Sequence, residues 1–424
     1  MLTPAYEAAL ALYRQGNGAG ALDSAIALVE TPASVEALGL AGLILAEAGR
    51  VDDLIRVTEF AATRGLPGPV LLARVLQYCL VDNRLAVLEG LVNLLPRDSP
   101  LFPLSVYFAG CARMVRGEID QSLSIFRLFR DLAAQPNQQP LIANPEVNVY
   151  FRQGCLVAPS AEVGAWLSNG AVYPPAMTEF AVLRQAEAGP IVYVACADSV
   201  YVERFGASLI LSLPEGASAH LHVVNPQPET AATLAAIEAA RAPGSFGYST
   251  SADRQYGHAV AYACARFFVL PLLLDLYGTR LAALDIDLRA TGHLAKLASL
   301  PDDFDFACFR MDRREPSSVF QCSILVCQPT DACRTYLAAL GRFCLPQLVL
   351  PLQLGWLVDQ AALFSVSHHF KTARPDFRFR TLNEMLGLTM DDLVVGVASD
   401  EDKHAMRYQV AHAFNGMQPG RPAS

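Results

Sequence analysis

Apolar residues recur at intervals of three and four along the first 135 residues, which is the period of an amphipathic helix. Leu54, Val57 and Phe60 show this spacing, and runs of β-branched residues are absent from this part of the sequence. The pattern predicts a domain made only of helices over residues 1–135.

A short turn sequence recurs in this domain at steps of 33, 34 and 34 residues. Its four copies are centred on Gly16, Gly49, Asn83 and Gly117. The segment resembles tetratricopeptide repeats, in which a helix pair recurs every 34 residues or so. One helix pair cannot bury its own apolar face, whereas stacked pairs can. The resemblance implies a groove for a peptide or a protein partner; a helical spacer or a dimerisation element without a ligand is the alternative.

Prolines mark residues 136–187 as a connector, beginning with Pro136 and Pro140. After it, compact apolar runs alternate with segments of helical spacing. Ile191–Cys196, His220–Val224 and Leu281–Leu284 are expected to be buried strands, and His220 and His222 to be surface or edge residues. Strand–helix alternation predicts an α/β domain with a parallel-rich sheet over residues 188–400, followed by a tail over 401–424.

Composition narrows the class of protein further. Hydrophobic residues make up 53% of the 424 residues and charged residues 17%, which excludes a mainly disordered chain. The net charge of −9 disfavours nucleic acid as a partner. No apolar run approaches the roughly 20 residues of a membrane span, and a basic signal segment is lacking. The ten cysteines form no CxxC pair, so we expect reduced thiols in a cytoplasmic protein.

Two carboxylates directly follow one of the expected strands, in the sequence Leu284-Asp285-Ile286-Asp287. In extended backbone the side chains of Asp285 and Asp287 point to the same face of the strand. Without a basic neighbour they repel each other and favour a hard cation such as Mg²⁺ or Mn²⁺, which could bind a diphosphate. A second such pair, in Asp303–Asp305, is expected to be only an acidic turn.

Four motifs in order make residues of about 190–365 resemble the family 8 glycosyltransferases. The motifs are Val192–Asp198 with Tyr201, Ala265-Arg266-Phe267, Leu284–Leu288 with Thr291-Gly292, and Trp356–Gln360. The resemblance implies a GT-A fold and retaining, metal-dependent transfer of a sugar from a nucleotide diphosphate donor of the UDP-sugar type.

The resemblance also implies roles for individual residues. Asp198 contacts the nucleotide base, and its motif neighbours Ala195 and Tyr201 also bind the substrate. Gln321 binds the substrate through its side-chain amide. Arg266 reaches the donor sugar or the diphosphate. Asp285 and Asp287 bind the metal. Asp359 and Gln360 lie beside the donor sugar and, with Arg266, form the catalytic set.

The sequence departs from the family pattern at three places. Val200 replaces an asparagine, Gln321-Cys322-Ser323 lacks a glycine, and the late histidine stretch is missing, so that His404 is the nearest substitute for a third metal ligand. A second hypothesis is therefore a catalytically degenerate nucleotide-sugar-binding or scaffold protein that acts through its helical repeats. A third is an enzyme that the repeats assemble into a homodimer.

Overall fold

The computed structural model describes residues 4–30, 35–63, 68–144, 147–157, 178–252, 259–348 and 357–399. The chain forms two compact units. Unit 1 comprises Met1–Ala158 together with Arg314–Pro316, and unit 2 comprises Pro159–Arg313 and Ser317–Ser424.

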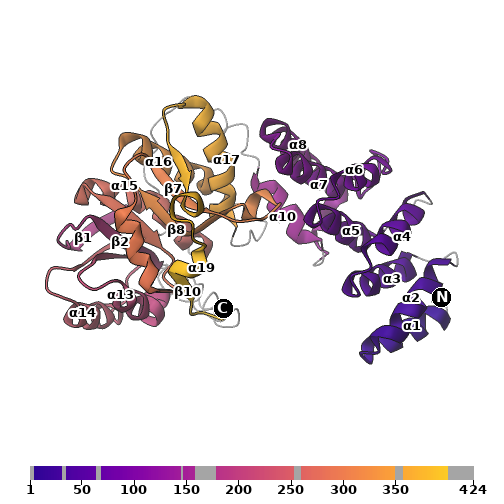
Figure 1. The fold of residues 1–424 in the computed structure, drawn as a ribbon, viewed down its shortest axis with the longest axis horizontal. Coiled ribbons are helices and arrows are strands. Elements are labelled where there is room, and N and C mark those ends of the chain that lie inside the picture. Colours follow the sequence, from indigo (N-terminus) through magenta and orange to yellow (C-terminus); the bar gives the residue numbers. More distant parts are fainter. Residues whose placement is uncertain are drawn as a thin grey trace, which may run out of the picture. The chain divides into compact units, whose positions relative to one another are not determined.

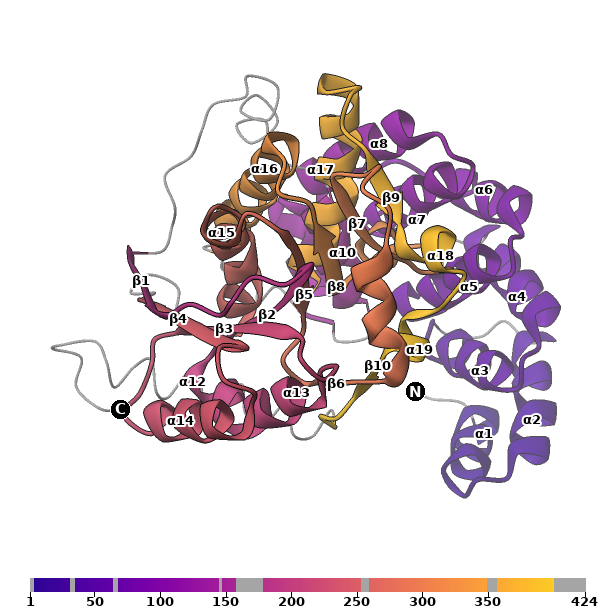
Figure 2. The same ribbon diagram turned by 60° about the vertical axis from the view of Figure 1, so that its left-hand side comes forward.

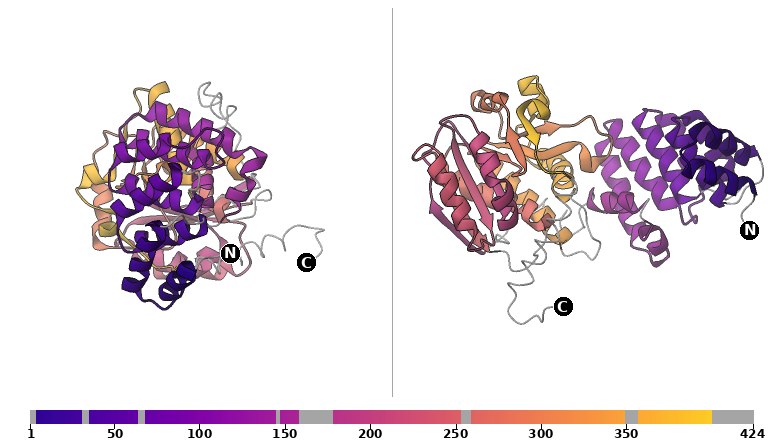
Figure 3. Two further views of the ribbon diagram at one scale, coloured as in Figure 1. Left: turned by 90° about the vertical axis from the view of Figure 1, so that its right-hand side faces the viewer. Right: turned by 90° about the horizontal axis from the view of Figure 1, so that it is seen from below.

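Unit 1 begins with four successive helix pairs, drawn in indigo and purple (Figures 1 and 3). The pairs are α1 (Pro4–Arg14) with α2 (Gly18–Glu30), α3 (Val35–Glu47) with α4 (Val51–Thr63), α5 (Pro69–Val81) with α6 (Leu85–Asn93), and α7 (Phe102–Val115) with α8 (Ile119–Ala133). All four recurrent turns contain a left-handed residue, with φ of 71° at Gly16, 66° at Gly49, 61° at Asn83 and 78° at Gly117. Glycine and asparagine adopt this conformation most readily, so the sequence period is a structural period. Membership of the tetratricopeptide family stays a prediction.

The expected connector over 136–187 is divided between the two units. Three short elements follow the helix pairs, namely η1 (Pro136–Gln138), α9 (Gln139–Ile142) and α10 (Asn148–Val157). α10 packs against α7 and α8, and therefore belongs to unit 1. At the other end of the connector, Thr178–Arg184 is a strand of unit 2.

Unit 2 is built on an eight-stranded sheet in the order β1-β4-β3-β2-β5-β8-β7-β9. In that order the strands are β1 (Thr178–Arg184), β4 (Phe246–Ala252), β3 (Ser218–Val224), β2 (Ile191–Asp198), β5 (Arg280–Leu284), β8 (Phe320–Cys327), β7 (Phe306–Arg310) and β9 (Phe379–Thr381). The four strands β4, β3, β2 and β5 are parallel, whereas β1, β8 and β7 pair antiparallel with their inner neighbours. The sheet is thus mixed, with a parallel centre. β6 (Leu288–Ala290) and β10 (Val394–Gly396) form a separate antiparallel pair.

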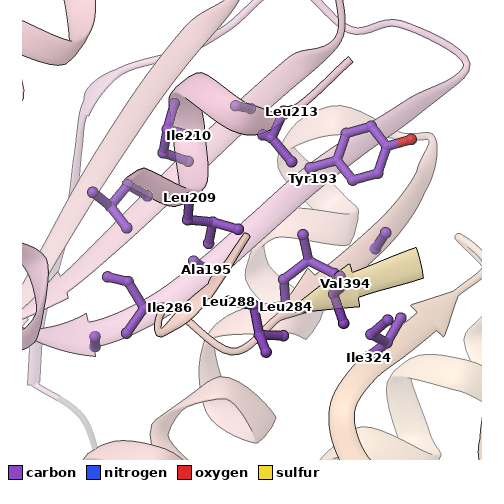
Figure 4. Close-up of a cluster of buried hydrophobic side chains, with 14 of the residues drawn as sticks. Tyr193, Ala195, Leu209, Ile210, Leu213, Leu284, Ile286, Leu288, Ile324 and Val394 are labelled. Atoms are coloured by element: carbon purple, nitrogen blue, oxygen red, sulfur yellow. The ribbon is translucent and has the colours of Figure 1, made fainter. Parts of the chain in front are cut away.

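Helices cover both faces of this sheet (Figure 2). One face carries α15 (Ala259–Tyr277), α16 (Asp331–Leu348) and α17 (Val358–Ala373); the other carries α12 (Ser199–Tyr201), the π-helical turn η2 (Val202–Gly206), α13 (Ala207–Ser212) and α14 (Thr230–Ala240). The shorter elements are η3 (Gly292–Ser299), η4 (Pro316–Ser318), α18 (Leu382–Leu386) and α19 (Met390–Leu393). Between β2 and α13, Tyr193, Ala195, Leu209 and Ile210 form part of the core (Figure 4).

One helix among the described residues is long and apolar enough to cross a membrane by length and composition. This segment, Val260–Tyr277 in α15, is 61% buried inside the protein. It packs against β2, β5 and α16. Its apolar character is therefore explained by its place in the core of unit 2.

The expectation for His220 and His222 is wrong, because both side chains are fully buried in the sheet rather than at a surface or edge. His220 Nδ1 lies 2.7 Å from the hydroxyl of Tyr277, and its Nε2 lies 2.8 Å from Ser249 Oγ. His222 continues the chain, with Nδ1 2.8 Å from Ser249 Oγ and Nε2 2.9 Å from Ser251 Oγ. The polar side chains of the neighbouring strands β3 and β4 thus hydrogen-bond each other, as buried polar groups in folded proteins generally do.

Candidate active site

The candidate site lies at the carboxyl ends of β2 and β5. The chain passes from β2 to β3 and β4 on one side of β2, and then returns to β5 on its other side. The strand order therefore reverses between β2 and β5, and open α/β sheets bind ligands beyond the strand ends at such a point. Asp198 ends β2, and Asp285 directly follows β5. The expected base-binding and metal-binding residues thus come from the two strands that flank this point.

Asp198 is buried and acts as the N-cap of α12. One oxygen of its carboxyl group accepts hydrogen bonds from the backbone N–H groups of Val200, at 2.8 Å, and Tyr201, at 3.2 Å. Burial raises the pKa of Asp198 to about 6, although these two hydrogen bonds act in the opposite direction. Tyr201 is itself buried, and the centroid of its ring lies 5.9 Å from that of the Phe205 ring.

Asp285 directly follows β5, whereas Asp287 lies in the turn that leads to β6, so the extended backbone expected from the sequence does not continue to Asp287. Both side chains are half-buried, whereas Ile286 between them is buried in the core (Figure 4). The turn is fixed by its main chain: Asp285 N donates to Ser323 O at 3.0 Å, and Asp287 O accepts from Val397 N at 2.9 Å.

Arg266 corrects a second expectation, namely that the two carboxylates lack a basic neighbour. Its Nη2 donates to Asp285 Oδ1 at 2.5 Å. The same guanidinium is anchored from α15 and β8, since Nε donates to Ala263 O at 2.8 Å and Nη1 to Cys322 O at 2.7 Å. Arg266 is buried, which lowers its pKa, but Asp285 and Asp359 more than offset this effect and the pKa lies above its usual value. It is therefore a fixed positive charge.

Asp359, in the first turn of α17, brings a further acidic group to Arg266. Burial raises the pKa of Asp359 to about 6; Arg266 lowers it and Asp285 raises it. The Cys322 side chain hydrogen-bonds the Asp359 carboxyl group, and Gln360 N donates to Asp359 Oδ1 at 2.9 Å. The guanidinium thus interacts with two carboxyl groups from different elements of the fold.

The two expected amide residues also meet. Gln360 Nε2 donates to Gln321 Oε1 at 3.2 Å, which links α17 to β8. Gln321 immediately precedes Cys322, the residue that contacts both Arg266 and Asp359. The structure therefore brings Arg266, Asp285 and Asp359 together with this amide pair.

Ala195 does not join this group, because the residue is 1% exposed and belongs to the hydrophobic core (Figure 4). His404 and Trp356 lie outside the described residues. The second Asp-x-Asp pair is structural: Asp305 accepts from Arg378 N at 2.8 Å and from Thr330 Oγ1 at 2.9 Å.

Oxygen ligands such as those of Asp285 and Asp287 suit Mg²⁺ or Mn²⁺. Within the described ranges, however, no group of three or more histidine, cysteine, aspartate or glutamate side chains is placed to hold a metal ion. One of the two candidate carboxylates is also paired with Arg266. The described residues therefore fit a cation only as part of a set that a bound diphosphate or water completes.

Three further residues at this edge, Cys322, Asn225 and Tyr262, have no local sequence motif that marks them as part of a site. Cys196, at the same edge, has a thiol whose pKa burial raises to about 12, so it is not a ready nucleophile.

No protein-family model matches this sequence, and no curated protein matches it. Among solved structures, the glycosyltransferase GlyE of Streptococcus pneumoniae TIGR4 is similar at 12% identity and a TM-score of 0.35, over 55% of this chain and 63% of that chain. Its apo form gives 11% identity and a TM-score of 0.33 over the same shares. The apo structure of the bifunctional glycosyltransferase WbbM gives 13% identity and a TM-score of 0.31, over 77% of this chain and 73% of that chain.

The chain spans just under two thirds of the GlyE chain, at 63%. All three TM-scores lie below 0.5, so we draw no conclusion on function from them. The proposal below rests on the residues at the strand ends.

Proposed function

We propose that unit 2 is a glycosyltransferase that takes a sugar from a nucleotide diphosphate donor, of the UDP-sugar type, in a metal-dependent reaction with retention at the anomeric carbon. The single observation that carries the proposal is the buried guanidinium of Arg266, 2.5 Å from Asp285 at the point where the strand order reverses. The retaining chemistry and the GT-A class follow from the motif resemblance alone.

The chemistry required is the stabilisation of a leaving nucleoside diphosphate. Electrostatic groups that are fixed before the reaction contribute most to such a step. Arg266 is held by two carbonyl oxygens independently of Asp285, so its charge stays at the strand edge whatever Asp285 binds. In the proposal, Asp198 contacts the base, and Asp285 and Asp287 hold Mg²⁺ or Mn²⁺, which supplies further positive charge to the diphosphate.

Asp359 and Gln360 are proposed to lie beside the donor sugar. Asp359 is buried against Arg266, and Gln360 is oriented by its hydrogen bond with Gln321. A carboxyl group and an amide on the first turn of one helix can bind sugar hydroxyl groups as acceptor and donor. Helix pairs of unit 1 are proposed to present a protein or peptide acceptor.

The alternative is a protein that binds a nucleotide sugar without transferring it. In this alternative Arg266 would bind the diphosphate of the donor without a metal ion, since Asp285 already has a cationic partner. Nor do the described residues bring three histidine, cysteine, aspartate or glutamate side chains together around a metal position.

Release of nucleotide from a panel of UDP- and GDP-sugars with Mn²⁺ tests the proposal. We expect slow release by the wild-type protein and its loss in Asp285→Asn/Asp287→Asn. Asp303→Asn is the matched control, since this half-exposed residue belongs to the other Asp-x-Asp pair. Donor binding without release by the wild-type protein would support the binding-protein alternative instead.

A further inference from the structure

Asn225 directly follows β3 with a φ of 52°, in the left-handed region that asparagine adopts more readily than other residues with a side chain. Its side chain is buried, with 8% exposed. Surrounding contacts decide which residue holds such a conformation inside the protein. The contacts of Asn225 show what fixes it.

Three polar groups of Asn225 contact three different elements. Its N–H donates to Ser251 O of β4 at 2.8 Å, and its carbonyl oxygen accepts from Ser199 Oγ at 2.5 Å. The side-chain amide Nδ2 donates to the hydroxyl of Tyr262 in α15 at 3.2 Å. Asn225 thus joins the carboxyl ends of β3 and β4 to the turn after β2 and to a helix on one face of the sheet.

Two of these contacts lie next to proposed donor-binding residues. Ser199 is adjacent to Asp198, and Tyr262 lies one helical turn before Arg266 on α15. Residues four apart on a helix share one face. Asn225 therefore links the turn that orients Asp198, through its carbonyl oxygen, to the helix that carries Arg266, through its side-chain amide.

We propose that Asn225 is a positioning residue that sets the place of Arg266 relative to Asp198, and hence the fit of the donor; this inference rests on the proposed function. Glycine would adopt the same backbone with less strain. An asparagine at this position keeps the left-handed turn and adds the amide that reaches Tyr262.

Two substitutions remove this one hydrogen bond from opposite sides. Asn225→Gly keeps the left-handed backbone and both main-chain contacts, whereas Tyr262→Phe keeps the ring and removes the hydroxyl. Asn83→Gly is the matched control, since Asn83 is a left-handed asparagine in a turn of unit 1, with a φ of 61°. The double variant Asn225→Gly/Tyr262→Phe tests whether the two changes remove the same interaction.

For nucleotide release, we expect the KM for the donor to rise about tenfold in each single variant, the effect of one lost hydrogen bond. The double variant should be no worse than either single variant. Because Arg266 also stabilises the leaving diphosphate, kcat should fall in the same variants and stay unchanged in Asn83→Gly. Equal KM values in the wild-type protein and both single variants would overturn the inference, as would effects that add in the double variant.

Amide hydrogen exchange gives a readout that needs no donor. We expect faster exchange at residues 199–202 and 259–266 in Asn225→Gly and Tyr262→Phe, with unit 1 unchanged. If the wild-type protein releases no nucleotide but these segments loosen, the proposed function fails and the positioning role stands. If exchange in both segments is unchanged, the positioning role is wrong whatever the activity.

Discussion

Arg266 Nη2 lies 2.5 Å from Asp285 Oδ1, although the two residues are on different elements and the guanidinium is almost fully buried. Asp359 interacts with the same guanidinium from α17. The single positive charge of Arg266 therefore interacts with two carboxyl groups at the edge of the sheet. Removing one partner of such a buried set leaves the others without compensation.

Arg266→Met should accordingly destabilise unit 2 by about 3–5 kcal/mol, because Asp285 loses its ion pair and Cys322 O loses a donor. Arg266→Lys should recover only part of this loss, since an ammonium group cannot match the planar fork of a guanidinium. Urea unfolding followed by circular dichroism measures both effects.

Arg334→Met is the control for this experiment. Arg334 pairs with Asp275 at 2.6 Å, but the aspartate side chain is 66% exposed. A surface pair of this kind contributes about 0–1 kcal/mol. If Arg266→Met were no more destabilising than Arg334→Met, the guanidinium would not hold the strand edge together.

The buried histidines predict a loss of stability in acid. Burial lowers the pKa of both His220 and His222 to about 3, whereas an unfolded histidine titrates near 6.5. As the pH falls from about 6.5 towards 3, the unfolded chain gains protons that the folded chain does not. Each histidine then lowers the free energy of unfolding by up to about 1.4 kcal/mol per pH unit.

The pKa of Asp198 and Asp359, raised to about 6 by burial, acts in the opposite direction. Their stabilising contribution is complete below about pH 3.8 and is lost as the pH rises to about 6. The histidine contribution is therefore measured as a difference: His220→Gln/His222→Gln should show a shallower fall in stability than the wild-type protein between pH 6.5 and 4. Parallel curves would mean that these histidines are not held neutral.

Two glycines of unit 1 should respond in opposite ways to alanine. In α10, a Cβ at Gly154 would lie 2.9 Å from Tyr107 Cδ2 and would also overlap the Phe129 ring. In α6, a Cβ at Gly90 would meet nothing within 4 Å. We expect Gly154→Ala to destabilise unit 1 by about 1–3 kcal/mol through overpacking. Gly90→Ala should stabilise it by about 0.5–1 kcal/mol, because glycine is entropically unfavourable in a helix.

Thermal unfolding of these two variants provides the measurement. Equal effects of the same sign would show that α10 does not pack closely on α7 and α8. The pair also separates the packing of the helices from their intrinsic propensity, because the chemical change is identical.

Some features of this fold were predictable because one local signal sufficed. The repeat of helix pairs follows from turn residues that take a left-handed conformation, and β2, β3 and β5 are short apolar runs buried on both faces. β4 has no such signal, because Gly247, Ser249 and Ser251 interrupt its apolar positions. The hydroxyl groups of the two serines find their partners in His220 and His222 of β3, and single-sequence patterns do not report such cross-strand pairing.

The candidate site likewise contains residues that a local sequence signal predicts and contacts that no local signal predicts. Carboxylates after an apolar strand were visible in the sequence at Asp285 and Asp287. The Arg266–Asp285 ion pair was not, because it depends on how α15 packs against β5. The contact of Cys322 with Asp359 likewise joins β8 to α17 and has no local signature.

The most direct test of the central claim, that this acidic edge binds a nucleotide diphosphate through a cation, is calorimetric titration with UDP and with GDP, in Mn²⁺ and in chelator. We expect the wild-type protein to bind UDP or GDP tightly, and only when Mn²⁺ is present. The affinity in Mn²⁺ should fall at least tenfold in Asp285→Asn/Asp287→Asn. Asp303→Asn should bind like the wild-type protein. Binding that is the same with and without Mn²⁺, or unchanged in the double variant, or absent from the wild-type protein, would contradict the account.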